Sequence, residues 1–259
     1  MMHPSFLLIS LYNYEAMGIR SIHSTLVNNG FDACMLFLKS DKRSRQEQMF
    51  KDPSILTKKE IQLFVSKVSE LNPDYLCFSL VSAHVPIVRN LVKEHLRWYY
   101  GKIIVGGIHP TILPDDCMDF ADIICRGEGE LPIIKLALAV DERKRPYEIQ
   151  NLWFKGYSSW FKNDMIEPTH DLDQYSIPVF QNGRSYVIDN NELSERDPYY
   201  NNTRYGIMIF RGCPYKCSFC SNSALSNLYK SKKPRSRSVE HVLSELRNVK
   251  EYLPQVGCI

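Results

Sequence analysis

The sequence RGCPYKCSFCSNS, residues 211–223, gathers three cysteines in a chain of 259 residues that has eight cysteines in all. Cys213, Cys217 and Cys220 follow the spacing C-x3-C-x2-C. Soft thiolates at this density suit iron–sulfur clusters or zinc. Three cysteines can ligate three irons of a four-iron cluster and leave the fourth iron open to another ligand. The spacing therefore favours an iron–sulfur cluster with one open iron.

Two other interpretations of these cysteines stay open. A structural zinc site takes four protein ligands, so zinc would need a distant fourth ligand, for which Cys258 and His241 are the downstream candidates. Alternatively, the cysteines are unrelated and buried, although Pro214, Lys216 and Ser218 between them argue against burial.

Upstream of the cysteines, short apolar runs alternate with stretches of helical periodicity, which predicts an α/β fold with a parallel sheet. The expected strands are 6–10, 31–39, 75–80, 102–107 and 121–125, and the expected helices are 19–29, 61–71, 86–98 and 131–140. The polar stretch 40–59 is expected to be a loop insertion. Residues 1–140 are thus predicted to form a doubly wound, Rossmann-like domain with a five-stranded parallel sheet.

In such sheets ligands bind beyond the carboxyl ends of the strands, where the strand order reverses. This rule points to the loops at 11–18, 79–84, 106–111 and 126–130. Gly106-Gly107 would let the backbone approach a ligand closely, although tight turns also explain glycines. His84 and His109 lie in these loops, where a ligand contact and an ordinary polar loop residue are both reasonable interpretations.

The rest of the chain divides into a connecting segment, 141–200, and a final part, 201–259. In the connecting segment we expect a hairpin from 152–155 and 160–168, turning near 162–164, and a linker at 172–180. In the final part we expect three further elements. These are a strand at 203–210, a helix at 239–253 capped by Ser238, and the opening of another strand at 256–259.

Composition and charge exclude several classes of function. The formal net charge of +3 does not indicate nucleic acid as a partner, and we read the basic run 230–238 as a solvated loop. The apolar run 6–11 is too short for a membrane span and lacks the basic flank of a signal peptide, so we expect a cytoplasmic protein.

The arrangement of the first 140 residues resembles the cobalamin-binding domain of cobalamin-dependent methyltransferases and mutases. That family has D-x-H-x-x-G after its first strand, S-x-L after its third and G-G after its fourth. Here the first motif keeps only its glycine, and Glu15 stands where the family has its cobalt-ligating histidine. The resemblance implies that cobalamin, if bound, receives no histidine ligand from this loop. The cofactor-binding residues it implies are Asn13, Glu15, Gly18, Ser79, Val81, Gly106, Gly107 and His109.

The phrase RGCPYKCSFC after a strand is similar to the radical S-adenosylmethionine (SAM) superfamily, and most similar to the branch with an amino-terminal cobalamin domain. The resemblance implies that the three cysteines hold a [4Fe-4S] cluster, whose open iron binds SAM and whose electron cleaves SAM to a 5'-deoxyadenosyl radical. Phe219 would lie near the adenine, although packing also explains an aromatic side chain there. The family's arginine, serine and glutamate before the first barrel helix are matched by Arg237, Ser238 and Glu240.

The part after residue 200 corresponds to little more than the first unit of a radical SAM (β/α) barrel, which in full takes roughly 250 residues. We therefore expect a truncated reading frame or a fragment, and one open unit leaves apolar faces uncovered. The function expected by resemblance is the front portion of an enzyme for methyl transfer, ring formation or rearrangement on a small-molecule substrate. Its electron donor would be a flavodoxin or ferredoxin. The alternative is a non-catalytic module that binds cobalamin or a nucleotide, with a zinc-binding or vestigial cysteine cluster.

Overall fold

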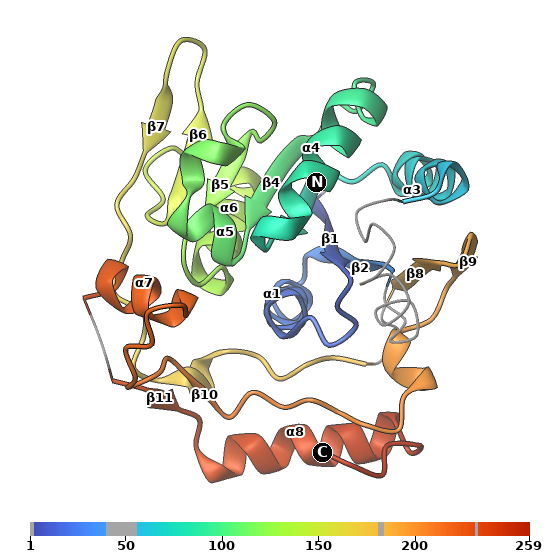
Figure 1. Ribbon diagram of the computed structural model, residues 1–259, viewed down its shortest axis with the longest axis vertical. Coiled ribbons are helices and arrows are strands. Elements are labelled where there is room, and N and C mark those ends of the chain that lie inside the picture. The colour runs from blue at the N-terminus through green and yellow to red at the C-terminus, as the bar shows by residue number, and fades with distance from the viewer. Residues whose placement is uncertain (1–2, 40–55, 181–183, 231–232) are drawn as a thin grey trace.

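A mixed sheet of nine strands forms the centre of the protein, whose computed structural model describes residues 3–39, 56–180, 184–230 and 233–259 (Figure 1). The spatial order of the strands is β7-β6-β5-β4-β3-β1-β2-β8-β9. The parallel part consists of β1 (Ser5–Leu11), β2 (Asp32–Leu38), β3 (Tyr75–Ser79), β4 (Lys102–Gly106), β5 (Ile123–Cys125) and β8 (Ser185–Asp189). The antiparallel edges are β6 (Leu152–Lys155) with β7 (Trp160–Lys162) on one side and β9 (Glu192–Ser194) on the other.

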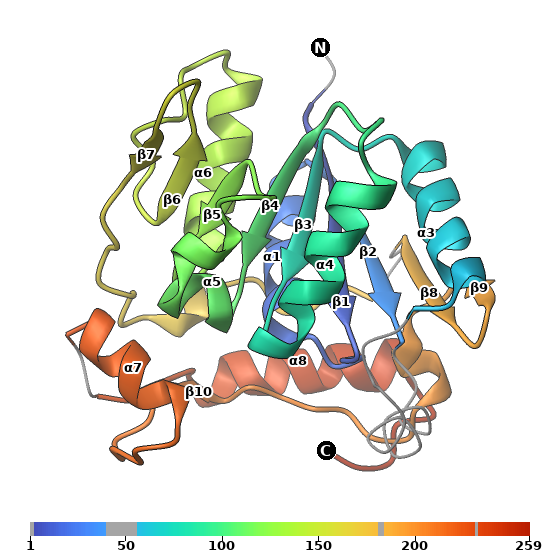
Figure 2. The same cartoon turned by 45° about the horizontal axis from the view of Figure 1, so that its top comes forward.

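Helices cover both faces of the sheet, as the alternating pattern predicts. One face packs on α1 (Met17–Asn28) and α6 (Glu130–Asp141), and the other on α3 (Lys58–Leu71) and α4 (Val85–Asn90), which a π-helical turn extends through Leu91–His95 (Figure 2). Fully buried β-strand residues alternate between the two cores, which is why these strands are apolar along their whole length.

Local signals fix several helix ends. Thr57 and Glu60 form a capping box at the start of α3, and Ser238 caps α8 (Val239–Tyr252) through a hydrogen bond from the His241 N–H. The short elements α5 (Ile108–Ile112) and α7 (Ser221–Leu228) had no clear periodicity in the sequence. In the described part of the chain, single turns of 3-10 helix lie at Ser82–His84, Pro114–Cys117, Leu172–Gln174 and Pro198–Asn201.

The sequence prediction of a doubly wound α/β domain is confirmed at the level of an α/β fold with a mostly parallel sheet, but the prediction of five strands is wrong. The segment 141–200 adds four strands to the sheet instead of only connecting two domains. Its hairpin forms where expected, but the turn lies at residues 156–159 and not at 162–164. β8 pairs in parallel with β2, which lies about 150 residues earlier, so no local sequence pattern could predict this pairing.

The prediction of a long strand at 203–210 is also wrong. Regular pairing there is limited to β10 (Phe210–Arg211) with β11 (Arg235–Ser236), and the segment before β10 makes one parallel bridge, Arg204 to Cys258. The expected strand at 256–259 is reduced to this bridge. The expected loop at 40–59 falls for residues 40–55 outside the described part of the chain, while Lys58 and Lys59 begin α3.

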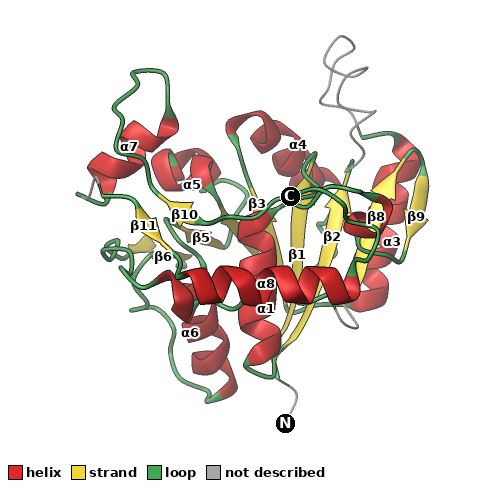
Figure 3. Cartoon of the chain, turned by 90° about the horizontal axis from the view of Figure 1, so that it is seen from below, coloured by secondary structure: helices red, strands yellow, loops and turns green. Residues whose placement is uncertain are grey.

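The final part of the chain lies across the carboxyl ends of the central strands. In Figure 2 the strands point toward α8, and Figure 3 shows α8 crossing in front of them from below. A small apolar cluster joins the two parts; it consists of Tyr14, Phe180, Tyr199, Tyr205, Val249 and Leu253. Among the residues that the structure describes, none of the helices combines the length and apolar character that a membrane crossing demands.

Candidate functional site

The strand order reverses between β1 and β3, since β2 lies on one side of β1 and β3, β4 and β5 lie on the other. This reversal leaves a crevice at the carboxyl edge of the sheet. A cavity of about 230 Å³ occupies it and extends down between the sheet and helices α1 and α6. The deep walls come from mid-strand and helix positions and are apolar or bear thiols: Leu8, Ile19, Ile22, Cys77, Ile104, Cys125 and Ile133.

Glycines form the mouth of this cavity, and two of them are not explained by the packing of the protein itself. A Cβ added at Gly18 would meet nothing within 4 Å, and one at Gly106 would make only an ordinary contact of 3.5 Å with the Cβ of Cys125. By contrast, Gly107 has a φ of +97°, and a Cβ there would lie 2.9 Å from the backbone of Leu80. The fold requires glycine at 107, whereas at 18 and 106 the small residue leaves space that a ligand can use.

A second cavity, of about 520 Å³, adjoins the first on the side of the cysteine loop. It lies against α5, α7 and the loop after β5, and Cys213 is part of its wall. Residues that line both cavities are Gly18, Gly107, Gly127, Glu128, Met208 and Arg211. The carboxyl edge of the sheet and the start of the cysteine loop therefore face the same space.

The cysteines of the motif differ from four of the others in exposure. Cys217 is exposed and Cys213 and Cys220 are half-buried, whereas Cys34, Cys77, Cys117 and Cys125 are buried. Burial raises the pKa of Cys117 and of Cys125 to about 12, which keeps those two thiols protonated. The motif thus supplies the accessible thiols that a metal cluster requires.

The backbone of the cysteine loop is partly ordered by its own hydrogen bonds. The Cys220 N–H donates to the Cys217 carbonyl at 3.1 Å, and the Ser223 hydroxyl donates to the same carbonyl at 2.8 Å. Within the described residues, no three side chains of histidine, cysteine, aspartate or glutamate converge as a ready-made metal site. By their chemistry, the three thiols of the motif fit an iron–sulfur cluster.

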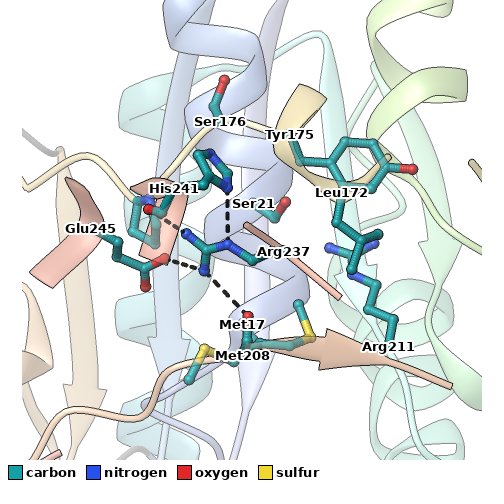
Figure 4. A pocket seen from close by; sticks show the side chains of 11 residues that line it. Met17, Ser21, Leu172, Tyr175, Ser176, Met208, Arg211, Arg237, His241 and Glu245 are labelled. Carbon is teal, nitrogen blue, oxygen red and sulfur yellow. Dashed lines mark hydrogen bonds and ion pairs between the residues drawn. The ribbon is translucent and has the colours of Figure 1, made fainter. Parts of the chain in front are cut away.

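Of the two candidates for a fourth zinc ligand, His241 is already engaged. Its Nδ1 lies 3.0 Å from the Nε of Arg237 and 3.2 Å from an oxygen of Asp173. Arg237 also donates to the Met208 carbonyl at 3.2 Å and pairs with the buried carboxylate of Glu245 (Figure 4). The cavity beside this group measures about 40 Å³, room for about one water molecule and not for a cofactor.

The solvated loop expected at 230–238 is found only in part: Lys230 and Lys233 are exposed, and residues 231–232 lie outside the described part of the chain, but two arginines of the run are not solvated. The side chains of Arg235 and Arg237 are each 10% exposed, and both pair with carboxylates. Burial acts to raise the pKa of Glu128, but Arg235 and Arg211 lower that pKa below its ordinary value. Of the family pattern at 237, 238 and 240, Arg237 anchors α8, Ser238 caps it, and Glu240 is exposed and pairs with Arg247 at 2.7 Å.

The structure brings some of the expected cofactor-binding residues together at the cavities and leaves others apart. Gly18, Ser79, Gly106 and Gly107 line the cavity of about 230 Å³, which is called the smaller cavity below, as the cavity of about 520 Å³ is called the larger. Asn13, Glu15, Val81, His109 and Phe219 line neither cavity.

The residues that line neither of these two cavities are either hydrogen-bonded elsewhere or exposed. The Glu15 carboxylate accepts from the Tyr14 hydroxyl at 3.2 Å, and the Asn13 side chain accepts from the Glu15 N–H at 3.1 Å. The Nδ1 of the buried His109 lies 3.0 Å from the Ser82 hydroxyl. Val81 is 45% exposed and Phe219 92% exposed.

Sequence reasoning missed the thiols of the deep wall and the role of Arg211. Cys77 and Cys125 read as strand residues, and only the strand order shows that they face one cavity. Arg211 stood inside the opening motif, but its partners Glu128 and Glu130 lie about 80 residues earlier. The phrase RGEGE, with two carboxylates beside glycines in a loop at the sheet edge, was the available signal.

Comparison with known proteins gives one family match, one similar curated protein and two similar solved structures. Residues 10–137 match the B12 binding domain family. The hopanoid C-3 methylase of Methylococcus capsulatus is 26% identical over 262 residues, which cover 96% of this chain and 43% of the methylase. The solved structure of the radical SAM methyltransferase TsrM of Kitasatospora setae, with cobalamin and a [4Fe-4S] cluster bound, matches with a TM-score of 0.65 and 17% identity, covering 96% of this chain and 46% of that one.

The cobalamin-dependent SAM radical enzyme OxsB, with aqua-cobalamin and SAM bound, shares the fold with a TM-score of 0.66 and 16% identity over 96% of this chain and 32% of that one. The chain therefore spans less than half the length of each of these proteins.

Proposed function

We propose that the chain binds cobalamin at the carboxyl edge of its sheet and a [4Fe-4S] cluster on Cys213, Cys217 and Cys220. The support is that residues 10–137 match the B12 binding domain family and that the chain is similar to cobalamin-dependent radical SAM enzymes. It would thus supply the front portion of an enzyme that cleaves SAM reductively. The observation that carries the proposal is the pair of adjoining cavities, one reaching into the domain and the other reaching Cys213.

The cavities differ in a way that suits the two parts of a cobalamin. The smaller cavity has apolar deep walls, which suit the flat base of the nucleotide tail. The larger cavity combines apolar side chains such as Met208 and Leu225 with polar and charged ones such as Asn222 and Arg235, a mixture that suits the amide-bearing corrin. Gly18 and Gly106 leave the mouth open between them.

Neither Asn13 nor Glu15 lines either of these cavities, so we propose no cobalt ligand from the loop after β1. When bound, the cluster and SAM supply one-electron chemistry and cobalamin serves as a carrier of a methyl group. The residues of this chain hold the two cofactors next to each other and keep the tail out of water.

We propose methyl transfer to a carbon of a small molecule as the reaction. The support is that hopanoid C-3 methylase is similar over 96% of the chain and that the structure of the methyltransferase TsrM shares its fold. A reduced flavodoxin or ferredoxin is the proposed source of electrons.

Cobalamin binding is tested by titrating the purified chain with hydroxocobalamin and following the absorbance of the corrin. Gly18→Leu puts four carbon atoms into the cavity mouth and is expected to weaken binding at least about tenfold, which corresponds to ~1.4 kcal/mol. Gly257→Leu is the matched control, because a Cβ at Gly257 also meets nothing within 4 Å but lies outside both cavities. Binding that is equal in all three proteins, or absent from the wild type, contradicts the assignment.

The cluster is tested separately by anaerobic reconstitution with iron and sulfide. We expect a broad visible absorbance that is lost in Cys213→Ala, Cys217→Ala or Cys220→Ala. Cys258→Ala, which removes another exposed thiol, should keep it. Stoichiometric zinc without an iron–sulfur absorbance would instead favour the non-catalytic binding module, and loss of the metal in Cys258→Ala would identify its fourth ligand.

A further inference from the structure

The short ladder that carries the cysteine loop contains an unfavourable pair of charges. In β10–β11, Arg211 and Arg235 are directly opposite each other. Like charges at such positions destabilise a ladder, and two strands of two residues have little stability alone. The loop with Cys213, Cys217 and Cys220 starts directly after β10, so the position of β10 determines where the loop begins.

Two carboxylates from the loop after β5 compensate these arginines. Glu128 accepts from Arg235 at 3.2 Å and lies 3.4 Å from Arg211, and Glu130 accepts a hydrogen bond from Arg211. The four side chains are 14% exposed at Arg211, 10% at Arg235, 15% at Glu128 and 3% at Glu130. Two positive and two negative groups, all largely withdrawn from solvent, balance one another, and each would be costly to hold there without its partners.

The loop after β5 also receives contacts from two tyrosines, Tyr175 and Tyr229. The Tyr175 hydroxyl donates to Glu128 at 2.9 Å, and the Tyr175 ring lies 4.7 Å from the guanidinium of Arg211. Gly127 has a φ of +79°, and a Cβ there would lie 2.6 Å from the hydroxyl of Tyr229, just after α7. The absence of a side chain at 127 therefore allows Tyr229 to approach the backbone of the B12-binding domain.

We infer that Arg211, Arg235, Glu128 and Glu130 form an ionic latch that fixes the cysteine loop over the cavities. They are positioning residues: none of the four would ligate the cluster, and each holds another element in place. Glu128 and Arg211 line both cavities, so a ligand there touches the latch. The latch therefore couples cobalamin binding to the ordering of the cysteine loop, and this second part rests on the proposed function.

The latch itself is tested without any cofactor, by amide hydrogen exchange of the whole chain. Glu128→Gln removes the shared charge, and exchange in residues 211–230 is expected to rise at least about tenfold, while β1, β3 and β4 stay unchanged. The matched control is Glu240→Gln, which removes an exposed carboxylate paired with Arg247. If Glu128→Gln does not fold, Arg235→Lys is used, because it retains the positive charge and loses only the paired N–H donors of the guanidinium. It is expected to raise exchange in the same residues. Exchange like that of the control would overturn the latch.

The coupling is tested by the ratio of cobalamin dissociation constants with and without the reconstituted cluster. The ratio cancels any direct contact between Glu128 and cobalamin. In the wild type the cluster is expected to tighten cobalamin binding at least about fivefold, and in Glu128→Gln the ratio should approach one. An equal ratio in both proteins would overturn the coupling. Absence of cobalamin binding in the wild type would refute the proposed function, and the exchange experiment would still decide on the latch.

Discussion

The buried pair of Arg20 and Asp197 provides a sharp test of how the parts of the chain are held together. Arg20 is 1% exposed and donates to both oxygens of Asp197, at 2.6 and 2.9 Å. It also donates to the carbonyls of Tyr14 and Glu15 and lies 4.4 Å from the ring of Tyr199. One guanidinium thus joins α1, the loop after β1 and the segment before residue 200.

Asp197→Asn keeps the shape of the side chain but leaves the Arg20 charge buried without a counter-ion. Breaking a buried pair from one side costs about 3–5 kcal/mol. For a protein of this size, about 1 kcal/mol corresponds to a Tm change of roughly 2–4 °C, so a Tm decrease of about 10 °C is expected. The double variant Arg20→Met with Asp197→Leu replaces both charged side chains by apolar ones and is expected to recover most of the lost stability.

Urea unfolding followed by far-ultraviolet circular dichroism measures these free energies, with Glu240→Gln as control. That control breaks a pair whose side chains are 72% and 66% exposed, so a change below about 1 kcal/mol is expected. If Asp197→Asn costs no more than the control, or if the double variant loses the sum of the two single losses, the pair does not act as described.

Three further predictions concern stability. Burial lowers the pKa of His23 to about 4, so the unfolded chain takes up a proton at higher pH than the folded chain. The contribution of the neutral His23 to stability is therefore complete above about pH 6.5 and falls by about 3 kcal/mol when the pH is lowered to 4. His23→Leu should lose that much less between pH 7 and 4 in urea unfolding, and identical profiles would contradict the assignment. Gly107→Ala should destabilise by about 1–3 kcal/mol, because its φ is +97° and its Cβ would meet the Leu80 backbone, whereas Gly106→Ala should change stability by less than about 1 kcal/mol. Thr57→Ala removes the capping box of α3 and should cost about 1 kcal/mol, and no change in the urea midpoint would argue against that cap.

The sequence was informative where a local pattern determines structure. The strands β1 to β5 are apolar because both faces are covered, and helices such as α8 show a helical apolar stripe with a capping residue before it. Gly18, Gly106 and Gly107 could be singled out at the site, since glycine marks close approach without reference to any partner.

It was uninformative where the partner is distant. β8 depends on β2, and Arg20 depends on a residue 177 positions later. Glu15 lies in the loop after β1, as expected, whereas His109 lies in α5 and not in a loop. The direction in which each side chain points follows from contacts that only the folded chain provides. For the same reason, the expected strand at 203–210 failed: its sequence alternates, but pairing requires a neighbouring strand, and only Phe210–Arg211 has a regular one.

We infer that ion pairs, more than apolar contacts, specify where the cysteine loop lies. The apolar cluster between the final part of the chain and the sheet edge contains six buried residues, and hydrophobic contact is not directional. The ion pairs Arg20–Asp197, Arg211–Glu130, Arg235–Glu128 and Arg237–Glu245 are all largely buried and each requires one specific partner. Buried ion pairs contribute little net stability compared with apolar replacements, but a displaced pair leaves unpaired charges, so wrong placements are penalised. An alternative placement of the loop would break several of these pairs at once, which explains why a short ladder with two opposed arginines can hold it over the cavities.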